Sequence, residues 1–158
     1  ARRCSTAVVV LGRAAGEDRE SLLEAGSYYL TEVERSLLER ARDAFERVVA
    51  VVVTGNVMDL SWAEELGVDA LLLAWCGGME GARAIARVLA GDDEPGGRLT
   101  STIAYRYEDY PSAGNFGDPR TSTSVTGTSR PSTPRPCSTP SASAWVTAST
   151  RSPPGPRS

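Results

Sequence analysis

The stretch AVVVLGRAAGEDRE, residues 7–20, places an unbroken apolar run directly before a charged segment that contains two glycines. Residues 7–11 have the composition of a buried β-strand, and Gly12 and Gly16 are typical of a loop that follows one. In open parallel α/β sheets, ligands bind beyond the carboxyl ends of the strands. Glu17, which is followed by an acid and an arginine, is therefore a candidate proton donor. The alternative is a solvated charged turn, which is ordinary chemistry between a strand and a helix.

The length and charge of the chain favour one folded domain and exclude several classes of partner. Its 158 residues suffice for one sizeable core, and its formal net charge is −3. Because the first two thirds of the chain contain no basic cluster, nucleic acid is not expected as a partner. No apolar run reaches the roughly 20 residues that span a bilayer, and the N-terminus does not resemble a signal segment. These features predict a soluble, cytoplasmic protein that binds no membrane.

The residue types leave carboxylates as the main candidates for proton transfer. The chain has no histidine and three cysteines, Cys4, Cys76 and Cys137, and every basic residue is an arginine. Without histidine, neither a Cys–His zinc site nor a Cys–His or Ser–His–Asp constellation can form within this chain. A carboxylate exchanges protons near neutral pH only where its environment raises its pKa.

Three further apolar runs predict strands. The β-branched run at residues 48–53 is typical of a strand that is buried on both faces of a parallel sheet. Residues 68–75 predict a third strand. Residues 99–104, after a Pro-Gly-Gly turn, predict a fourth.

Helical patterns alternate with these runs. Residues 31–34 and 61–64 each match a capping box, and a third helix is expected between residues 77–78 and Gly91. The first helix is predicted to bury an apolar stripe of Val33, Leu37, Leu38, Ala41 and Phe45 that continues to Val48. The third is predicted to turn Ala82, Ile85, Ala86, Val88 and Leu89 inward. The alternation predicts a three-layer α/β/α sandwich with a mainly parallel sheet, incomplete at both ends.

The composition changes abruptly after Asp118. No acidic residue occurs again, and Ser, Thr, Pro and Arg dominate residues 120–158. Such a segment cannot bury enough apolar surface to offset the entropy of ordering it. We expect residues 1–119 to form the domain and residues 120–158 to be disordered. A mucin-like stalk or a basic interaction tail is the functional alternative for this segment.

Five segments, in this order and at similar spacing, resemble the second domain of family 3 glycoside hydrolases of the β-glucosidase type. They are residues 12–20, 26–30, 56–62, 74–81 and 95–99, within a resemblance that covers residues 7–119. The resemblance implies a retaining hydrolase that acts on β-linked glucosides, xylosides or related oligosaccharides, with no metal or organic cofactor. It also implies a preceding barrel domain with the nucleophilic aspartate, and an acid/base glutamate on this α/β domain.

The resemblance assigns the acid/base role to Glu17, which stands directly before Asp18 and Arg19. Many family members have one or two residues between this glutamate and the Asp-Arg pair, so the loop here is compact. We expect Arg19 to bind Asp18 or a sugar hydroxyl, because pairing with Glu17 would lower a pKa that an acid catalyst needs raised. Asp18, Arg19, Tyr28 and Trp62 are candidate substrate-binding residues. Tyr28 could instead cover the sheet edge, and Trp62 could pack in the core.

Other motifs favour structural roles or weaker alternatives. Trp75, at a strand end, is expected to pack. Gly77, Gly78 and Gly81 lack the lysine and the spacing of a phosphate loop and predict a tight strand-to-helix connection. The two glycines of residues 12–16 do not match the dinucleotide pattern, so a flavodoxin-like nucleotide binder is a weak alternative. A non-catalytic carbohydrate-binding or interaction module on the same fold is the main alternative.

Two departures from the family pattern matter. The barrel domain is not part of this chain, so we expect the chain alone to be inactive. Family members also continue with a Tyr-Pro-Phe-Gly-x-Gly-Leu type segment, where residues 136–147 read PCSTPSASAWVT. Permitted codons for these residues, read two bases later, encode Val-Leu-Tyr-Pro-Phe-Gly-Phe-Gly-Leu-Gly-Tyr. We therefore expect a frameshift near Arg120, an out-of-frame tail, and apolar surface left exposed on the domain.

Overall fold

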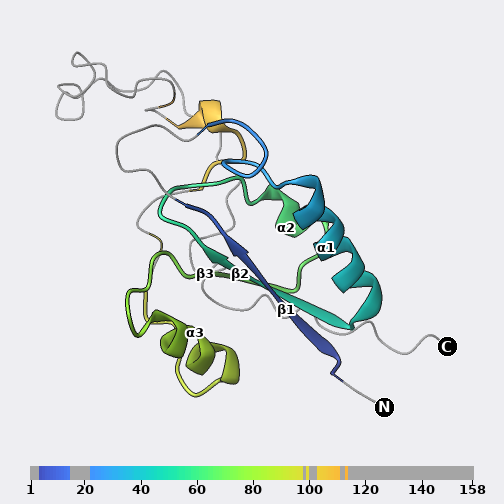
Figure 1. The fold of residues 1–158 in the computed structure, drawn as a ribbon, viewed down its shortest axis with the longest axis vertical. Coiled ribbons are helices and arrows are strands. Elements are labelled where there is room, and N and C mark those ends of the chain that lie inside the picture. The colour runs from blue at the N-terminus through green and yellow to red at the C-terminus, as the bar shows by residue number, and fades with distance from the viewer. Residues whose placement is uncertain (1–3, 15–21, 98, 100–102, 111–112, 114–158) are drawn as a thin grey trace.

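The computed structural model describes residues 4–14, 22–97, 99, 103–110 and 113. They contain a parallel three-stranded sheet, in the order β1-β2-β3, with helices on both sides (Figure 1). The elements are β1 (Thr6–Gly12), α1 (Glu32–Ala44), β2 (Arg47–Val53), α2 (Ser61–Glu65), β3 (Ala70–Leu73), α3 (Gly81–Ala90) and a 3-10 turn, η1 (Tyr107–Asp109). The predicted α/β class with a parallel sheet is confirmed.

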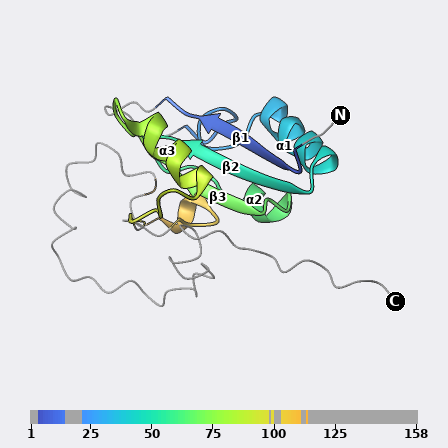
Figure 2. The ribbon, with the colours of Figure 1, turned by 90° about the horizontal axis from the view of Figure 1, so that it is seen from below.

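The helices form the outer layers of the fold. α1 and α2 lie on one side of the sheet and α3 lies on the other, as Figures 1 and 2 show. The core between the sheet and the first two helices is a cluster of buried apolar side chains: Val9, Leu11, Leu38, Ala41, Val48, Ala50, Val52, Met58, Leu60, Trp62 and Ala63. This cluster holds the carboxyl ends of the strands in place.

The central strand is buried on both faces, as its sequence predicts. Val48, Ala50, Val51 and Val52 of β2 are fully buried. Val51 is opposite Val10 of β1 on one side and Leu72 of β3 on the other. A mostly β-branched run therefore forms the middle of the sheet, and Val49 and Val53 are the positions of this run that are only half-buried.

The capping box of α1 is confirmed. The Thr31 hydroxyl accepts a hydrogen bond from the backbone N–H of Glu34 at 3.2 Å, and the Glu34 carboxylate accepts one from the backbone N–H of Thr31 at 2.8 Å. The buried stripe is narrower than predicted. Leu38 and Ala41 are buried, whereas Val33 is 75% exposed and Leu37 is 43% exposed. The three-stranded sheet therefore packs against only part of the apolar face of α1.

The second predicted capping box is wrong, although its helix exists. α2 has Leu60 at the N-cap, and no side chain caps it there. The carboxylate of Asp59 accepts a hydrogen bond from the backbone N–H of Ser61 at 3.0 Å instead. The aspartate just before the helix therefore bonds the N–H group of Ser61, which a capping box would have paired with the side chain of Glu64.

The later elements differ in extent from the prediction. β3 occupies only part of residues 68–75. Of the predicted fourth strand, residues 100–102 lie outside the described residues, and Leu99, Ile103 and Ala104 are not in a strand. α3 ends where expected, at Gly91 with a left-handed φ of 80°. Its predicted inward face is only partly covered: Ile85 and Val88 are half-buried, whereas Ala82, Ala86 and Leu89 are exposed.

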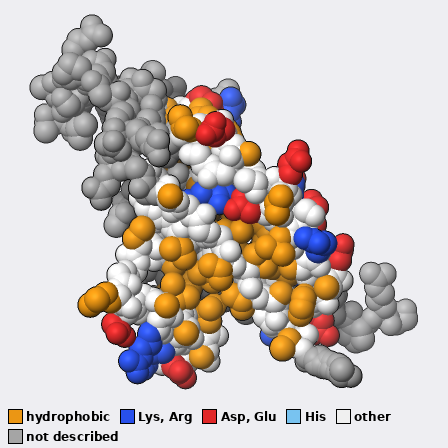
Figure 3. Space-filling model, in the orientation of Figure 1, with side chains coloured by type: hydrophobic (Ala, Val, Ile, Leu, Met, Phe, Trp, Pro, Cys, Tyr) orange, Lys and Arg blue, Asp and Glu red, His pale blue; other side chains and the backbone are white. Residues whose placement is uncertain are grey.

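The side of the sheet that faces away from α1 exposes apolar side chains. Val8 is 48% exposed and Val10 is 62% exposed on β1. Figure 3 shows hydrophobic side chains gathered over the strands and around α3 on this side of the molecule. The expected exposure of apolar surface is therefore seen, with its position fixed at β1 and α3.

Candidate active site

The three parallel strands end at one edge of the sheet, which is where the candidate site lies. β1 ends at Gly12, β2 at Val53 and β3 at Leu73. The backbone N–H of Arg13 donates to the carbonyl of Val53 at 2.9 Å, so the pairing of the first two strands continues one residue further. In the sequence, the segment that carries the predicted acid/base residue comes shortly after Arg13.

The predicted catalytic segment itself lies outside the described residues. Glu17, Asp18 and Arg19 belong to residues 15–21, so their roles stay predictions. The chain is described again from Leu22. The structure therefore describes the surroundings of the predicted site through the contacts of residues up to Ala14 and from Leu22 onward.

Arg13 makes the most extensive set of polar contacts beside this segment. Its side chain is only 6% exposed and forms a two-pronged ion pair with Glu34, with Nη1–Oε1 at 2.5 Å and Nη2–Oε2 at 2.7 Å. Nε donates to the carbonyl of Ser27 at 3.2 Å, and Nη2 donates to the carbonyl of Tyr29 at 3.4 Å. We call Arg13, Ser27, Tyr29, Thr31 and Glu34 the Arg13 clamp.

Glu34 is held in its charged form by this environment. Hydrogen bonds from the Arg13 guanidinium, chiefly, and from Thr31 lower the pKa of Glu34 to about 2, against the opposing effect of partial burial. Its Oε2 atom also accepts from the Thr31 hydroxyl at 2.9 Å. The same carboxylate thus completes the α1 cap and neutralises Arg13.

Tyr28 lies in a tyrosine cluster that covers the sheet edge. It is 1% exposed and makes edge-on ring contacts with Tyr29 and Tyr107, with centroids 5.0 and 5.3 Å apart. Among the described residues, its hydroxyl has no hydrogen-bond partner of ordinary geometry. Burial, with smaller contributions from Tyr110 and Asp59, raises the pKa of Tyr28 above its usual value. The packing alternative describes this arrangement, and substrate binding by Tyr28 stays a prediction.

Trp62 is enclosed in the core. Its side chain is 1% exposed, and its indole Nε1 donates to the carbonyl of Asp59 at 2.8 Å. Both its apolar ring and its polar N–H are therefore satisfied by protein groups, as the packing alternative predicts. Stacking of Trp62 on a sugar would require these contacts to change, and that role also stays a prediction.

Trp75 adds a strained position to the same edge. It is half-buried, lies two residues after the end of β3 and has a φ of 51°, the one positive value among the described non-glycine residues. A bulky side chain in the left-handed region is an uncommon and costly conformation. The sequence did not signal this feature, because tryptophan has no preference for such backbone geometry.

The glycines after β3 form a tight turn rather than a phosphate loop. A Cβ atom on Gly77 would lie 2.7 Å from the Cα of Gly81, and Gly78 has a φ of 65°. The predicted strand-to-helix connection is confirmed.

Cys4 and Cys76 are exposed free thiols, while Cys137 lies outside the described residues. The described residues contain no group of three potential metal ligands and no helix long and apolar enough to cross a membrane.

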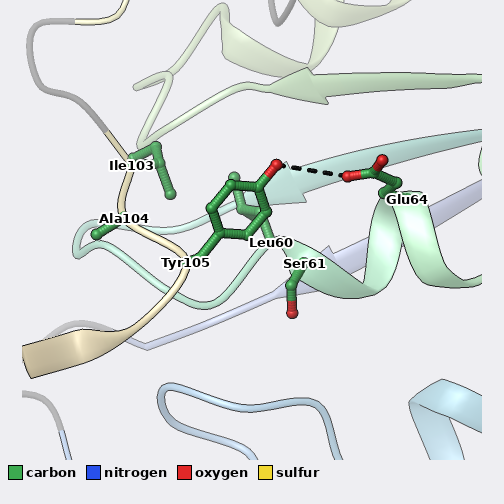
Figure 4. A pocket seen from close by; sticks show the side chains of 6 residues that line it. All are labelled: Leu60, Ser61, Glu64, Ile103, Ala104 and Tyr105. Atoms are coloured by element: carbon green, nitrogen blue, oxygen red, sulfur yellow. Dashed lines mark hydrogen bonds between the residues drawn. The ribbon is translucent and has the colours of Figure 1, made fainter. Parts of the chain in front are cut away.

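A small pocket lies between α2 and the segment before η1. Its lining residues are Leu60, Ser61, Glu64, Ile103, Ala104 and Tyr105 (Figure 4). The Tyr105 hydroxyl points toward Glu64 and lies 3.4 Å from its carboxylate. This pocket contains none of the predicted site residues.

Sequence analysis did not find the Arg13 clamp. A partial signal was present, since Arg13 follows the first strand and Glu34 is the acidic member of a capping box. Nothing in a single sequence links two residues so far apart along the chain. Their contact depends on how β1 and α1 pack.

Comparison with known proteins is consistent with this architecture. Residues 1–135 match the model of the glycosyl hydrolase family 3 C-terminal domain. The chain is 42% identical over 116 residues to a β-glucosidase from Ruminococcus albus, with 73% of this chain and 12% of that protein covered.

Solved structures give the same result. A β-glucosidase from Paenibacillus barengoltzii is similar with a TM-score of 0.67 and 44% identity, over 72% of this chain and 13% of that one. β-Glucosidase 3B from Thermotoga neapolitana, solved in complex with α-D-glucose, has a TM-score of 0.66 and 30% identity, over 74% of this chain and 17% of that one. This chain therefore spans between an eighth and a sixth of the length of these relatives.

Proposed function

This chain belongs to glycosyl hydrolase family 3, and we propose that it supplies the general acid/base residue, Glu17, to a retaining β-glucosidase-like hydrolase. The observation that supports the proposal is that β1 ends at Gly12, at the carboxyl edge of a parallel sheet, and that Glu17 comes shortly after it in the sequence. That edge is where open α/β sheets bind their ligands. The family match supplies the reaction class.

The proposed chemistry needs two carboxyl groups on opposite sides of the scissile bond. Glu17 protonates the departing glycosidic oxygen while a nucleophilic aspartate, about 5–5.5 Å away, attacks the sugar. Glu17 then removes a proton from the water that releases the sugar from the enzyme. The nucleophile belongs to a barrel domain outside this chain, so the chain alone does not turn over glycosides.

Glu17 must carry a proton at neutral pH to act as an acid. Burial beneath a sugar and a nearby anionic nucleophile both raise a carboxyl pKa, whereas a paired arginine lowers it. Arg13, close to Glu17 in sequence, has its charge already engaged by Glu34. This arrangement supports the proposal, because it removes one cation that could hold Glu17 ionised.

The proposed substrates are β-linked glucosides and related oligosaccharides. Asp18 and Arg19 are proposed to bind each other or sugar hydroxyls, and no metal or organic cofactor takes part. Most of the groups that select the sugar are expected on the barrel domain.

The test joins this chain, in one polypeptide, to the portion of the Ruminococcus albus β-glucosidase that precedes the matched region. Hydrolysis of an aryl β-glucoside by this fusion is expected to fall by about 10²–10⁴-fold in Glu17→Gln. Glu24→Gln, which removes the charge of an exposed carboxylate further along the chain, is the matched control and should retain far more activity. A folded, inactive parent fusion would contradict the proposal. An active fusion that Glu17→Gln leaves unchanged would favour the non-catalytic module.

We also propose that residues 120–158 are an out-of-frame translation. The family match runs to residue 135, past Pro119, and thus into this segment. The support is the possible re-encoding of residues 136–147 as a family-like Tyr-Pro-Phe-Gly segment. The nucleotide sequence decides it, since codons that cannot be rephased in this way would remove the proposal.

A further inference from the structure

The Arg13 clamp connects the two sides of the segment that carries Glu17. Arg13 directly follows β1, whereas Ser27, Tyr29 and Glu34 all come after residues 15–21 in the chain. One buried guanidinium therefore bonds to the end of the strand, to the returning chain and to the start of α1. Its Nη1 atom also donates to the carbonyl of Gly12 at 3.0 Å.

The contacts of the clamp are directional and shielded from water. Arginine presents its N–H groups in a planar fork that fits a carboxylate in one orientation. Glu34 is fixed in turn, because its Oε2 atom accepts from both the backbone N–H and the hydroxyl of Thr31. With Arg13 only 6% exposed, this pair is screened by solvent and salt far less than a surface pair.

We propose that Arg13 is a positioning residue for Glu17, an inference that rests on the proposed function. By joining Arg13 to Ser27, Tyr29 and Glu34, the clamp fixes the chain that leaves β1 against the chain that comes after residues 15–21. Acid/base catalysis is sensitive to this placement, since an error of about 1 Å can cost about a hundredfold in rate. Arg13 acts through the backbone and does not touch the substrate.

A second pair on the same helix offers a matched control. Arg35 makes a two-pronged ion pair with Glu65, with Nη1–Oε1 at 2.9 Å and Nη2–Oε2 at 3.1 Å. This pair joins α1 to α2, contacts nothing on the two sides of residues 15–21 among the described residues, and is 39% and 59% exposed. Arg35→Met therefore removes the same kind of ion pair without touching the clamp.

The decisive readout is the dependence of hydrolysis on the leaving group. In the fusion described above, kcat/KM is measured for phenyl β-glucoside, which needs a proton donor, and for 2,4-dinitrophenyl β-glucoside, which scarcely does. Arg13→Met and Glu34→Gln are expected to lower kcat/KM for the phenyl glucoside by about a hundredfold and to change the dinitrophenyl glucoside little. Arg13→Lys should lie between, because it keeps the charge and loses the fork. Arg35→Met should change neither substrate.

The outcomes separate the two proposals. If Glu17→Gln produces the selective loss and neither clamp variant does, the positioning role is overturned. If Glu17→Gln itself shows no selective loss, the proposed function fails instead. Equal losses on both substrates in Arg13→Met and Glu34→Gln would make the clamp a purely structural feature and would also overturn the inference.

A measurement on the 158-residue chain alone adds a test that needs no activity. Trypsin cleavage after Arg19 is expected to be several-fold faster in Glu34→Gln and Arg13→Met than in Arg35→Met, at a temperature where all three remain folded by circular dichroism. Equal rates in all three variants would overturn the inference. Glu34→Gln carries this test if Arg13→Met does not fold.

Discussion

Gly77 lies against Gly81 so closely that a Cβ atom on the first would be 2.7 Å from the Cα of the second. A Cβ atom added at Gly77 would therefore force the start of α3 to move. We predict that Gly77→Ala destabilises the chain by about 1–3 kcal/mol, as overpacking against backbone does. Gly96→Ala is the control, because nothing lies within 4 Å of a Cβ atom at that position. Urea unfolding of the two variants measures the difference, and equal midpoints would contradict the prediction.

The stability of the chain should depend on acid through Glu34. Its folded pKa of about 2 lies below the ordinary 4.5, so its contribution is complete above about pH 4.5 and is lost as the pH falls toward 2. The loss is at most about 3.5 kcal/mol, since one pKa unit corresponds to about 1.4 kcal/mol. Glu34→Gln should flatten this part of the stability curve, measured by urea unfolding between pH 5 and pH 2.

Glu65→Gln provides the comparison for this acid dependence. Arg35 lowers the pKa of Glu65 as well, but that pair lies at the surface, where salt screens it. We expect the Glu65 effect to be small and to vanish in 1 M NaCl, while the Glu34 effect persists. Loss of both effects in salt would mean that the Arg13–Glu34 pair is not shielded.

The exposed side of the sheet should govern solubility without governing stability. Val10 is 62% exposed, while its register partner Val51 is fully buried. Val10→Thr is predicted to reduce aggregation and the binding of an apolar dye, with little change in unfolding free energy. Val51→Thr should cost about 1–3 kcal/mol, because it buries an unpaired hydroxyl. Light scattering and dye fluorescence of the matched pair test this.

Trp62 is predicted to be a packing residue whose loss costs about 3–5 kcal/mol on substitution by alanine. Trp62→Phe should be milder, although it leaves the carbonyl of Asp59 without its indole donor. In a variant that keeps Trp62 as its single tryptophan, the emission should be blue-shifted and unaffected by glucose. A glucose-dependent change would restore Trp62 as a sugar-stacking residue.

The sequence predicted elements well where local chemistry decides the structure. The Thr31–Glu34 capping box, the buried run of β2 and the glycine end of α3 all depend on near neighbours, and all are confirmed. The Ser61–Glu64 pattern failed because Asp59, two residues before α2, bonds the backbone N–H of Ser61. Both Asp59 and Glu64 could bond the N–H of Ser61, and the capping-box pattern considers only Glu64.

Features that depend on tertiary packing could not be predicted from the sequence. The apolar stripes of α1 and α3 were predicted to be buried along their whole length, yet Val33 and Leu89 are exposed, because which part of a stripe is buried depends on how the helix sits on the sheet. The contact of Arg13 with Glu34 and the left-handed backbone of Trp75 arise only from the fold. Glu17 was selected by its place after a strand and by the family resemblance, and its role stays a prediction.

The buried cluster has a consequence for synthesis of the chain. Its members extend only from Val9 to Ala63, with partly buried neighbours that include Leu73 and Ile103. A ribosome therefore delivers nearly the whole core before it translates residue 120, and such a compact unit can fold while attached. Changes downstream, a shifted reading frame among them, therefore act on a nascent chain whose main core residues have already been synthesised. What they alter is the surface that the emerging polypeptide would have covered.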